Sequence, residues 1–160
     1  MSEISHLPVS RYLTFSLGSE EYAIPLLNVR EVIGMPKLRE IPQTPSHFLG
    51  LMDLRGEVIS VIDLRVKFNI KNPKTQNAEA TVIIFDYNAM HVGVVVDSVN
   101  SVLVPRVNDI SDKPGIESQK NTEYITGVYR RDGDLILLLD LAKTLSQEDH
   151  KTINKVKAAA

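Results

Sequence analysis

The 160-residue sequence predicts an all-β protein: two five-stranded SH3-like β-barrels related by an internal repeat, followed by a short C-terminal helix. The first observation behind this fold class is a series of short strand-type runs separated by glycine and proline turns. The second is that no long amphipathic helical pattern occurs in the body of the chain. The third is the repeat, because two similar halves of about five strands each can close into small barrels and hide most of their sheet edges.

The repeat is clearest around two glycine-bounded strand pairs. Three residues recur at an offset of 77 positions: Gly50 as Gly127, Gly56 as Gly133 and Asp63 as Asp140. Earlier in each copy the offset is 70, which places residues 82–85 on residues 12–15. The copies therefore span about residues 11–68 and 80–145, and the second carries about seven extra residues in a polar loop at 108–123. Contiguous barrels and barrels that exchange strands between the halves are both compatible with this repeat.

The first copy begins with strand-type residues at 11–18 and 21–24 on either side of Gly18, which predicts a β-hairpin. Pro25 cannot donate a ladder hydrogen bond, so the second strand should end there or lie at an edge. The apolar spacing of residues 26–33 fits one helical turn that runs into a strand. Residues 34–45 contain three prolines and predict an ordered excursion. A brief helical turn at 46–49 is expected before the strands around Gly50 and at 58–62.

Residues 69–79 are polar and almost free of apolar side chains, which predicts a flexible linker between the copies. The second copy then supplies strand-type runs at 82–85, 92–96 and 99–103, and again from Gly127 onward. Residues 146–149 offer an N-cap and an acidic first turn. The tail at 146–160 is therefore expected to form a short C-terminal helix, with Ile153 and Val156 at helical spacing.

The composition indicates a globular protein, with 43% hydrophobic and 24% charged residues. The absence of cysteine excludes disulfides, thiolate zinc sites and cysteine nucleophiles. A formal net charge of −2 and 6% aromatic residues argue against nucleic-acid binding, which normally shows a basic surface or stacking aromatics. The N-terminus lacks a signal-peptide pattern and the apolar runs are too short to span a bilayer. We therefore expect a cytoplasmic protein without direct membrane insertion.

Residues that could carry chemistry are scattered along the chain. The four histidines lack partners at ligand spacing, so no metal site is expected. Four aspartates each follow an apolar run, where aspartates commonly bond turn amides: Asp63, Asp86, Asp97 and Asp140. General acid–base catalysis would need two of them to converge in a cleft. Phosphate- and dinucleotide-binding motifs and the nucleophile elbow are absent. The sequence thus predicts neither an enzyme nor a cofactor.

Several segments together resemble the CheW family, the coupling proteins of bacterial chemotaxis. They are residues 15–24, 29–33, 41–42, 44–45, 50–56, 61–65, 92–99 and 122–127. The resemblance extends over about residues 11–145, nearly the whole chain. It implies two five-stranded SH3-like barrels, in agreement with the repeat, within a single CheW-like domain over residues 1–160.

This resemblance implies a non-enzymatic adaptor with two partners. One is the cytoplasmic tip of methyl-accepting chemoreceptors, and the other is the regulatory domain of the histidine kinase CheA. It implies a protein that is monomeric in isolation and is recruited from the cytoplasm to membrane receptor arrays. The receptor-binding residues carried over by position are Val29, Glu31, Gly50, Arg55, Val99 and Val102. The kinase-binding residues are Leu26 and Ile116.

Physical arguments accompany the receptor-binding assignments. A receptor tip is a helical hairpin, and a helix docks in an apolar groove through spaced anchors. Val99 is the repeat partner of Val29, so both copies can offer valines to one groove, although ordinary core packing is an alternative role for them. Gly50 would permit close approach of the partner, because any Cβ there could push a helix away.

Arg55 has two candidate roles. It could anchor the receptor tip, or it could pair with an acid such as Glu31 across the seam between the barrels. The second copy has Asp132 at the equivalent position, so the two turns cannot serve the same partner. On the kinase side, Ile116 is an apolar residue stranded in a polar loop, which favours a contact with a partner over a local plug.

Two other functions stay open from sequence alone. Small β-barrels often bind nucleic acids, and salt-sensitive retardation of single-stranded DNA or RNA would indicate this function. An enzyme would have to use Asp63 and Asp140, for which no accompanying nucleophile, base or cofactor motif is present.

Overall fold

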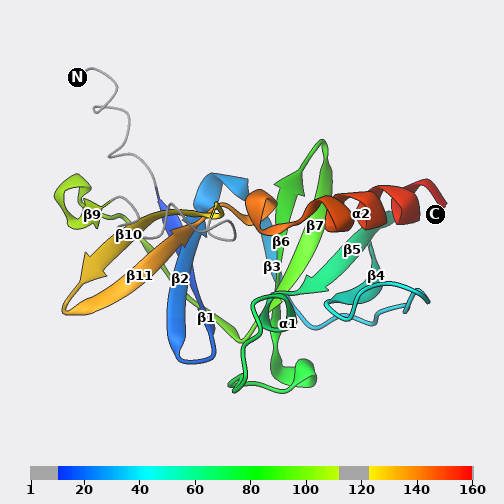
Figure 1. The fold of residues 1–160 in the computed structure, drawn as a ribbon, viewed down its shortest axis with the longest axis horizontal. Coiled ribbons are helices and arrows are strands. Elements are labelled where there is room, and N and C mark those ends of the chain that lie inside the picture. The colour runs from blue at the N-terminus through cyan, green and yellow to red at the C-terminus, as the bar shows by residue number, and fades with distance from the viewer. Residues whose placement is uncertain (1–10, 112–122, 160) are drawn as a thin grey trace.

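The computed structural model describes residues 11–111 and 123–159, whose strands form two neighbouring sheets (Figure 1). The strands are β1 (Tyr12–Leu17), β2 (Glu20–Pro25), β3 (Val29–Gly34), β4 (Phe48–Leu54), β5 (Glu57–Asp63), β6 (Thr81–Tyr87), β7 (Met90–Val96), β8 (Ser98–Leu103), β9 (Ile110–Ser111), β10 (Ile125–Arg131) and β11 (Asp134–Leu139). The α-helices are α1 (Leu64–Lys67) and α2 (Gln147–Ala159). The 3-10 helices are η2 (Leu26–Asn28), η3 (Asn77–Glu79), η4 (Val107–Asp109) and η6 (Leu141–Thr144).

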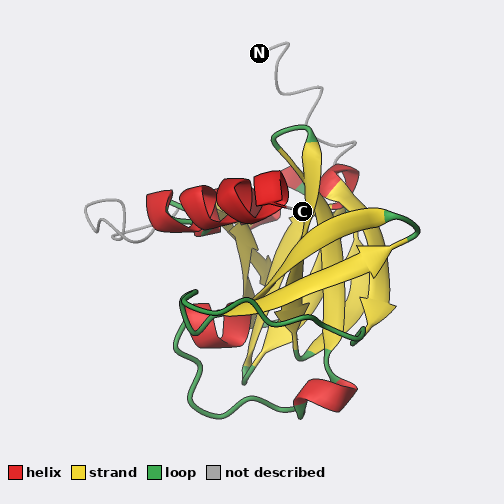
Figure 2. Ribbon diagram, turned by 90° about the vertical axis from the view of Figure 1, so that its right-hand side faces the viewer, coloured by secondary structure: helices red, strands yellow, loops and turns green. Residues whose placement is uncertain are grey.

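Strands dominate the described chain, and α2 is a single longer helix packed along one side (Figure 2). The predicted all-β fold with a short C-terminal helix is confirmed. The predicted helical turn at 46–49 is wrong, because a single turn, closed by the bond from the Phe48 amide to the Pro45 carbonyl, leads directly into β4 at Phe48. The proline-rich segment before β4 has no regular element, but Arg39 forms an isolated antiparallel bridge with Leu51.

The two sequence copies exchange their leading hairpins. In the six-stranded sheet, here called sheet A, the order is β8-β1-β2-β11-β10-β9, so the hairpin of the first copy lies among strands of the second. In the five-stranded sheet B the order is β3-β6-β7-β5-β4, so the hairpin of the second copy lies among strands of the first. The β2–β11 and β5–β7 pairings that join each guest hairpin to its host strands are parallel.

The internal repeat extends to the strand register. Phe15 lies opposite Tyr22 in sheet A, and the residues 70 positions later, Phe85 and Val92, lie opposite each other in sheet B. The register shifts recur as well, since β3 and β8 each skip one residue against their partner at equivalent positions. Neither strand order closes on itself within the described residues, so each barrel remains an open sheet with edge strands.

One hydrophobic core is shared by both sheets. Its fully buried members include Phe15 and Leu17 from β1, Phe85 from β6 and Leu139 from β11. The C-terminal helix contributes Ile153 and Val156 to the same cluster. A continuous core of this kind joins the barrels into one packed body, since removing either sheet would expose the apolar face of the other.

Asp149 fixes the position of α2 on the body. Its amide donates to the Ser146 hydroxyl at 3.2 Å, and its carboxylate accepts from the Ser146 amide at 2.9 Å, which is a reciprocal N-terminal cap. The same carboxylate contacts His47 Nε2 at 2.5 Å and Lys67 Nζ at 2.7 Å. These bonds outweigh the effect of burial and lower the pKa of Asp149 to about 2.

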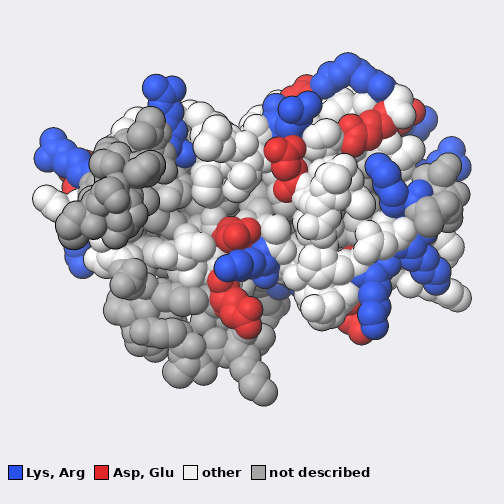
Figure 3. All heavy atoms as spheres, turned by 90° about the horizontal axis from the view of Figure 1, so that it is seen from above, with Lys and Arg blue, Asp and Glu red and all other residues white. Residues whose placement is uncertain are grey.

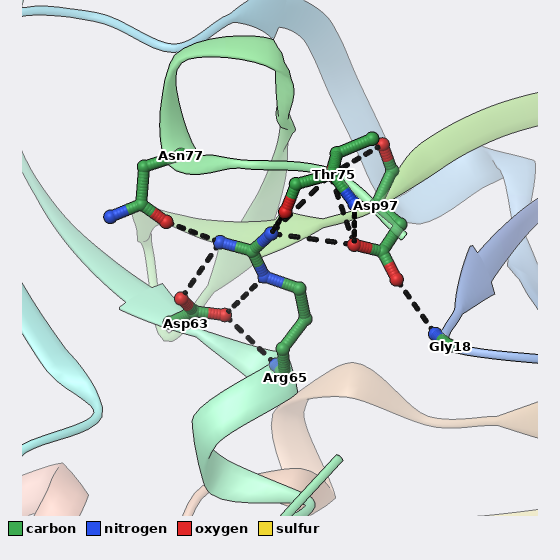
Figure 4. A network of polar contacts seen from close by, with 6 residues as sticks. All are labelled: Gly18, Asp63, Arg65, Thr75, Asn77 and Asp97. Carbon is green, nitrogen blue, oxygen red and sulfur yellow. Dashed lines mark hydrogen bonds and ion pairs between the residues drawn. The ribbon is translucent and has the colours of Figure 1, made fainter. Parts of the chain in front are cut away.

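A buried polar network joins the two copies (Figure 4). The Arg65 guanidinium lies between Asp63, at 3.0 Å, and Asp97, at 3.3 Å, and all three residues are buried. Asp97 also accepts from the amide of Gly18 in the β1–β2 turn at 2.7 Å. The carbonyl of Thr75, in the segment between the copies, accepts from Arg65 at 2.8 Å. The network thus ties the exchanged hairpin, the connecting segment and sheet B together.

Candidate functional site

Arg55 stands at the tip of the β4–β5 hairpin. With Gly56 it forms a two-residue loop in which both residues have positive φ, 52° and 89°. This conformation matches the twist of the flanking strands, and glycine adopts it without penalty. The Gly56 amide donates to Asp53 Oδ1 at 2.9 Å, which holds the turn closed. The turn therefore presents the Arg55 guanidinium on a fixed support.

The Arg55 guanidinium donates to Glu31 on β3. Strands β3 and β4 are opposite edges of sheet B, so this ion pair requires that the open sheet curl far enough for side chains at its two edges to reach each other. The pairing with Glu31 was one of the roles inferred from sequence, but it lies within one barrel and not across the seam between two. The hydrogen bond and the negative charge of Glu31 raise the pKa of Arg55.

The ion pair remains accessible to a partner. The Arg55 side chain is 71% exposed and that of Glu31 is 32% exposed. An exposed pair of this kind contributes little to folding stability, because water screens its charges. A partner that excluded water from this ion pair would contact two charged groups that already lie in one geometry.

Gly50 is buried and has a structural role that the sequence analysis did not foresee. Its φ is +143°, and a Cβ there would overlap the carbonyl of Arg39, which bridges to Leu51. Its repeat partner Gly127 has an equivalent neighbour, since a Cβ would lie 3.1 Å from the carbonyl of Ser111. Close approach of the chain's own segment therefore accounts for a glycine at this position, and close approach of a partner helix stays a prediction.

The three predicted valines occupy edge strands of different sheets. Val29 lies on β3 at the edge of sheet B, and Val99 and Val102 lie on β8 at the edge of sheet A. Val29 and Val99 are half-buried and pack against the central core. Val102 is 51% exposed. Core packing accounts for part of the first two side chains, whereas Val102 offers an unburied apolar surface on its edge.

Of the two predicted kinase-binding residues, the structure describes only Leu26. Leu26 begins η2 and is half-buried against the central core. Ile116 lies outside the described residues. The adjacent Leu27, which is not among the predicted residues, is 94% exposed. A leucine so exposed on a short 3-10 turn is a stronger contact candidate than its neighbour. The sequence offers no signal that separates the two leucines, because one turn decides which of them faces the core.

The turn equivalent to Arg55-Gly56 has the same backbone and a different side chain. Asp132 has φ 49° and Gly133 has φ 86°, so the two hairpin tips are conformationally alike. The guanidinium near this tip belongs to Arg131, which pairs with Glu21 at 2.6 Å. Only the shape of the turn is therefore repeated, and the charge presented at the tip is reversed.

The aspartates considered for catalysis have structural partners. Asp63 caps α1 by accepting from the Arg65 amide at 2.9 Å, and Asp140 accepts from the Lys143 amide at 3.4 Å at the start of η6. Within the described residues, no three histidine, aspartate or glutamate side chains are grouped as a metal site would require. None of the described helices is long and apolar enough to cross a membrane. The described surface thus leaves a charged pair, Arg55 with Glu31, and two apolar side chains, Leu27 and Val102, accessible to other molecules.

Comparisons with known proteins agree with this class. The CheW-like domain profile matches residues 11–149. The chain is 34% identical over 145 residues to the chemotaxis protein CheW of Klebsiella aerogenes, covering 91% of this chain and 87% of that protein. It is 30% identical over 140 residues to the CheW of Helicobacter pylori, covering 88% and 84%. The crystal structure of the scaffolding protein TtCheW from Thermoanaerobacter tengcongensis superimposes with a TM-score of 0.78 at 27% identity, covering 88% and 94%.

The two sheets, each with its exchanged hairpin, define a two-barrel protein of the scaffold class. It belongs to the CheW family of chemotaxis scaffold proteins.

Proposed function

We propose that this protein is the non-enzymatic adaptor that couples the cytoplasmic tips of methyl-accepting chemoreceptors to the regulatory domain of the histidine kinase CheA. The observation that carries the proposal is the exposed Arg55–Glu31 ion pair on a rigid hairpin tip at the edge of sheet B. In this proposal the protein works in the cytoplasm, is monomeric in isolation and is recruited to receptor arrays at the membrane.

The receptor face consists of Arg55 and Glu31 together with the valines of the edge strands, Val29, Val99 and Val102. The ion pair supplies an oriented polar anchor, and the valines supply the apolar contacts that a helical receptor tip needs. Gly50 acts indirectly, by allowing the segment around Arg39 to pack on β4.

The kinase face contains Leu26 and Ile116, and we add Leu27 because its side chain is 94% exposed. Loss of a large exposed leucine costs the folded protein little, whereas a leucine buried at an interface is worth about 1.5–3 kcal/mol. A substitution of Leu27 should thus weaken binding without changing stability, whereas a substitution of half-buried Leu26 would change both.

The receptor assignment is tested with Arg55→Ala, measured by pull-down of a receptor cytoplasmic fragment. We expect binding to weaken about tenfold, because a central charged anchor is lost, while capture of the CheA regulatory domain is unchanged. The matched control is Asp132→Ala, which truncates the same position of an equivalent turn in the other copy. Equal losses in both variants, or a loss that accompanies unfolding by circular dichroism, would make the role of Arg55 structural.

The kinase assignment is tested with Leu27→Ser in a pull-down of the CheA regulatory domain. Kinase capture should fall and receptor capture should persist, with the melting temperature unchanged. Val66→Ser on α1 is the control, since Val66 is also exposed, at 44%, but is outside the proposed faces. Undiminished kinase capture by Leu27→Ser would remove this residue from the interface, and Ile116→Ser can be compared in the same assay.

A further inference from the structure

A pocket of about 1050 Å³ lies on sheet B, and none of the described residues proposed to bind receptor or kinase lines it. Three parts of the chain enclose it: the segment at 36–44 that precedes β4, the strands β4 and β5, and one turn of α2. The segment is held in place by reciprocal backbone hydrogen bonds between Arg39 and Leu51, at 2.8 and 2.9 Å. The Asp149 contacts hold α2 on the opposite side. The walls of the pocket are therefore fixed before any ligand arrives.

The pocket has an apolar lining and a basic rim. Its apolar side chains are those of Pro36, Leu38, Ile41, Pro42, Leu51, Met52, Val58 and Val156. Three cations stand among them: Lys37, Arg39 and Lys155. Each of these residues is exposed, and none forms an ion pair with another described residue. In Figure 3, lysine and arginine side chains gather on the right of the viewed face, around the C-terminal end of α2.

The lining contains one carboxylate, that of Asp53, and it already accepts a hydrogen bond from the Gly56 amide. The site thus offers net positive charge around a hydrophobic floor. A ligand complementary to it has an apolar face flanked by carboxylates, because such charges would satisfy the three cations without leaving any buried alone.

We propose that this pocket is a docking site for an acidic amphipathic helix of a partner protein. A helix with its side chains is about 10 Å wide, so a cylinder of the pocket volume is roughly 13 Å long, about two and a half turns. A helix of that length can place apolar residues at i, i+3 and i+7 against the floor. The volume is also at the upper limit of roughly 1000 Å³ for small-molecule pockets, which favours a peptide.

This inference does not rest on the proposed adaptor function. None of Leu26, Leu27, Val29, Glu31, Arg55, Val99 or Val102 lines the pocket. Failure of the receptor or kinase pull-downs would therefore not argue against the docking site. Failure of the peptide-binding test would not argue against the adaptor function.

The test is fluorescence anisotropy with a labelled helical peptide of roughly 18 residues, long enough to be helical in water. It carries leucines at i, i+3, i+4 and i+7 spacing, glutamates beside this leucine stripe and alanines at its remaining positions, and a second peptide has lysines in place of the glutamates. We expect the leucine–glutamate peptide to bind saturably and the leucine–lysine peptide not to bind. Lys37→Glu and Lys155→Glu should each weaken binding about tenfold, the loss typical of a charge pair turned repulsive.

The matched control is Lys157→Glu, the same charge reversal on α2 at an exposed residue that does not line the pocket. Binding by this variant should stay within about twofold of the unmodified protein. The proposal is overturned if the glutamate peptide does not bind, if the lysine peptide binds equally, or if Lys157→Glu is as damaging as Lys155→Glu. If decanoate binds saturably and the glutamate peptide does not bind, the pocket is a site for an acyl anion instead.

Discussion

At the scale of single residues, the charge of Asp149 should give the folding stability a measurable dependence on pH. Its pKa is lowered from 3.8 to about 2 by Lys67, His47 and the Ser146 amide, which outweigh burial. A carboxylate with a depressed folded-state pKa adds stability above its unfolded pKa, and that stability is lost as pH falls through the folded value. The contribution should therefore be complete above about pH 5 and disappear between about pH 4 and pH 2.

Asp149→Asn should lower the free energy of unfolding at pH 7 by about 2 kcal/mol, the value of a pKa shift of this size. The difference from the unmodified protein should shrink as pH falls toward 2, and urea unfolding at a series of pH values measures it. Glu148→Gln alters an exposed residue in the same helical turn and should change stability by less than about 0.5 kcal/mol. A pH-independent deficit in Asp149→Asn would assign its role to packing of the helix rather than to charge.

The residues of the candidate site differ in how far they could be predicted. The Arg55–Glu31 pair was accessible to sequence reasoning, because an arginine at a two-residue turn projects outward and can reach an acid on a neighbouring strand. The exposure of Leu27 was not accessible, since Leu26 and Leu27 are chemically alike and the rotation of one 3-10 turn decides which is buried. The reason for Gly50 was also hidden, because its neighbour Arg39 is brought there by a segment without regular structure.

At the scale of elements, the segment at 36–44 is a strap that packs on the edge strand β4, and Gly50 makes its close approach possible. Gly50→Ala should force the strap outward, because its Cβ would overlap the Arg39 carbonyl and φ is +143°. We expect a loss of about 2 kcal/mol in stability and faster hydrogen exchange at the Leu51 amide, which donates to Arg39.

The control for this prediction is Gly34→Ala at the end of β3. No atom lies within 4 Å of a Cβ built at Gly34, so the change should be nearly neutral. Unchanged exchange at Leu51 in Gly50→Ala would mean that the strap is not held through this contact. The same pair of variants also tests the walls of the pocket, because the strap forms one of them.

Most elements could be predicted because their signals are local. Period-two runs and glycine turns gave the hairpins, and the acidic first turn gave α2. The expected helical turn at 46–49 was wrong because Phe48 already pairs with Ile62 as the first residue of β4. A contact between residues so distant in sequence leaves no pattern in the local segment.

For the whole molecule, the internal repeat predicted two similar barrels but could not assign hairpins to sheets. A hairpin that stays with its own copy and a hairpin that is exchanged need the same alternation of apolar and polar residues. The periodicity of the sequence is therefore the same for both arrangements. What distinguishes them is long-range pairing, such as the parallel β2–β11 and β5–β7 contacts. The Arg65 network then links the exchanged hairpin to the opposite sheet through the bond from Gly18 to Asp97.

This exchange predicts that neither sequence copy folds alone. Residues 11–79 contain β3, β4 and β5 but lack the β6–β7 hairpin that joins them, and their own β1–β2 hairpin lacks its host sheet. Each separate half would leave sheet edges unpaired and half of the shared core exposed. We expect residues 11–79 and residues 80–160, prepared separately, to lack cooperative thermal unfolding by circular dichroism. Mixed in equal amounts, they should recover a β-sheet spectrum and a single transition, whereas cooperative melting of either half alone would show that its sheet is stable without the exchanged hairpin.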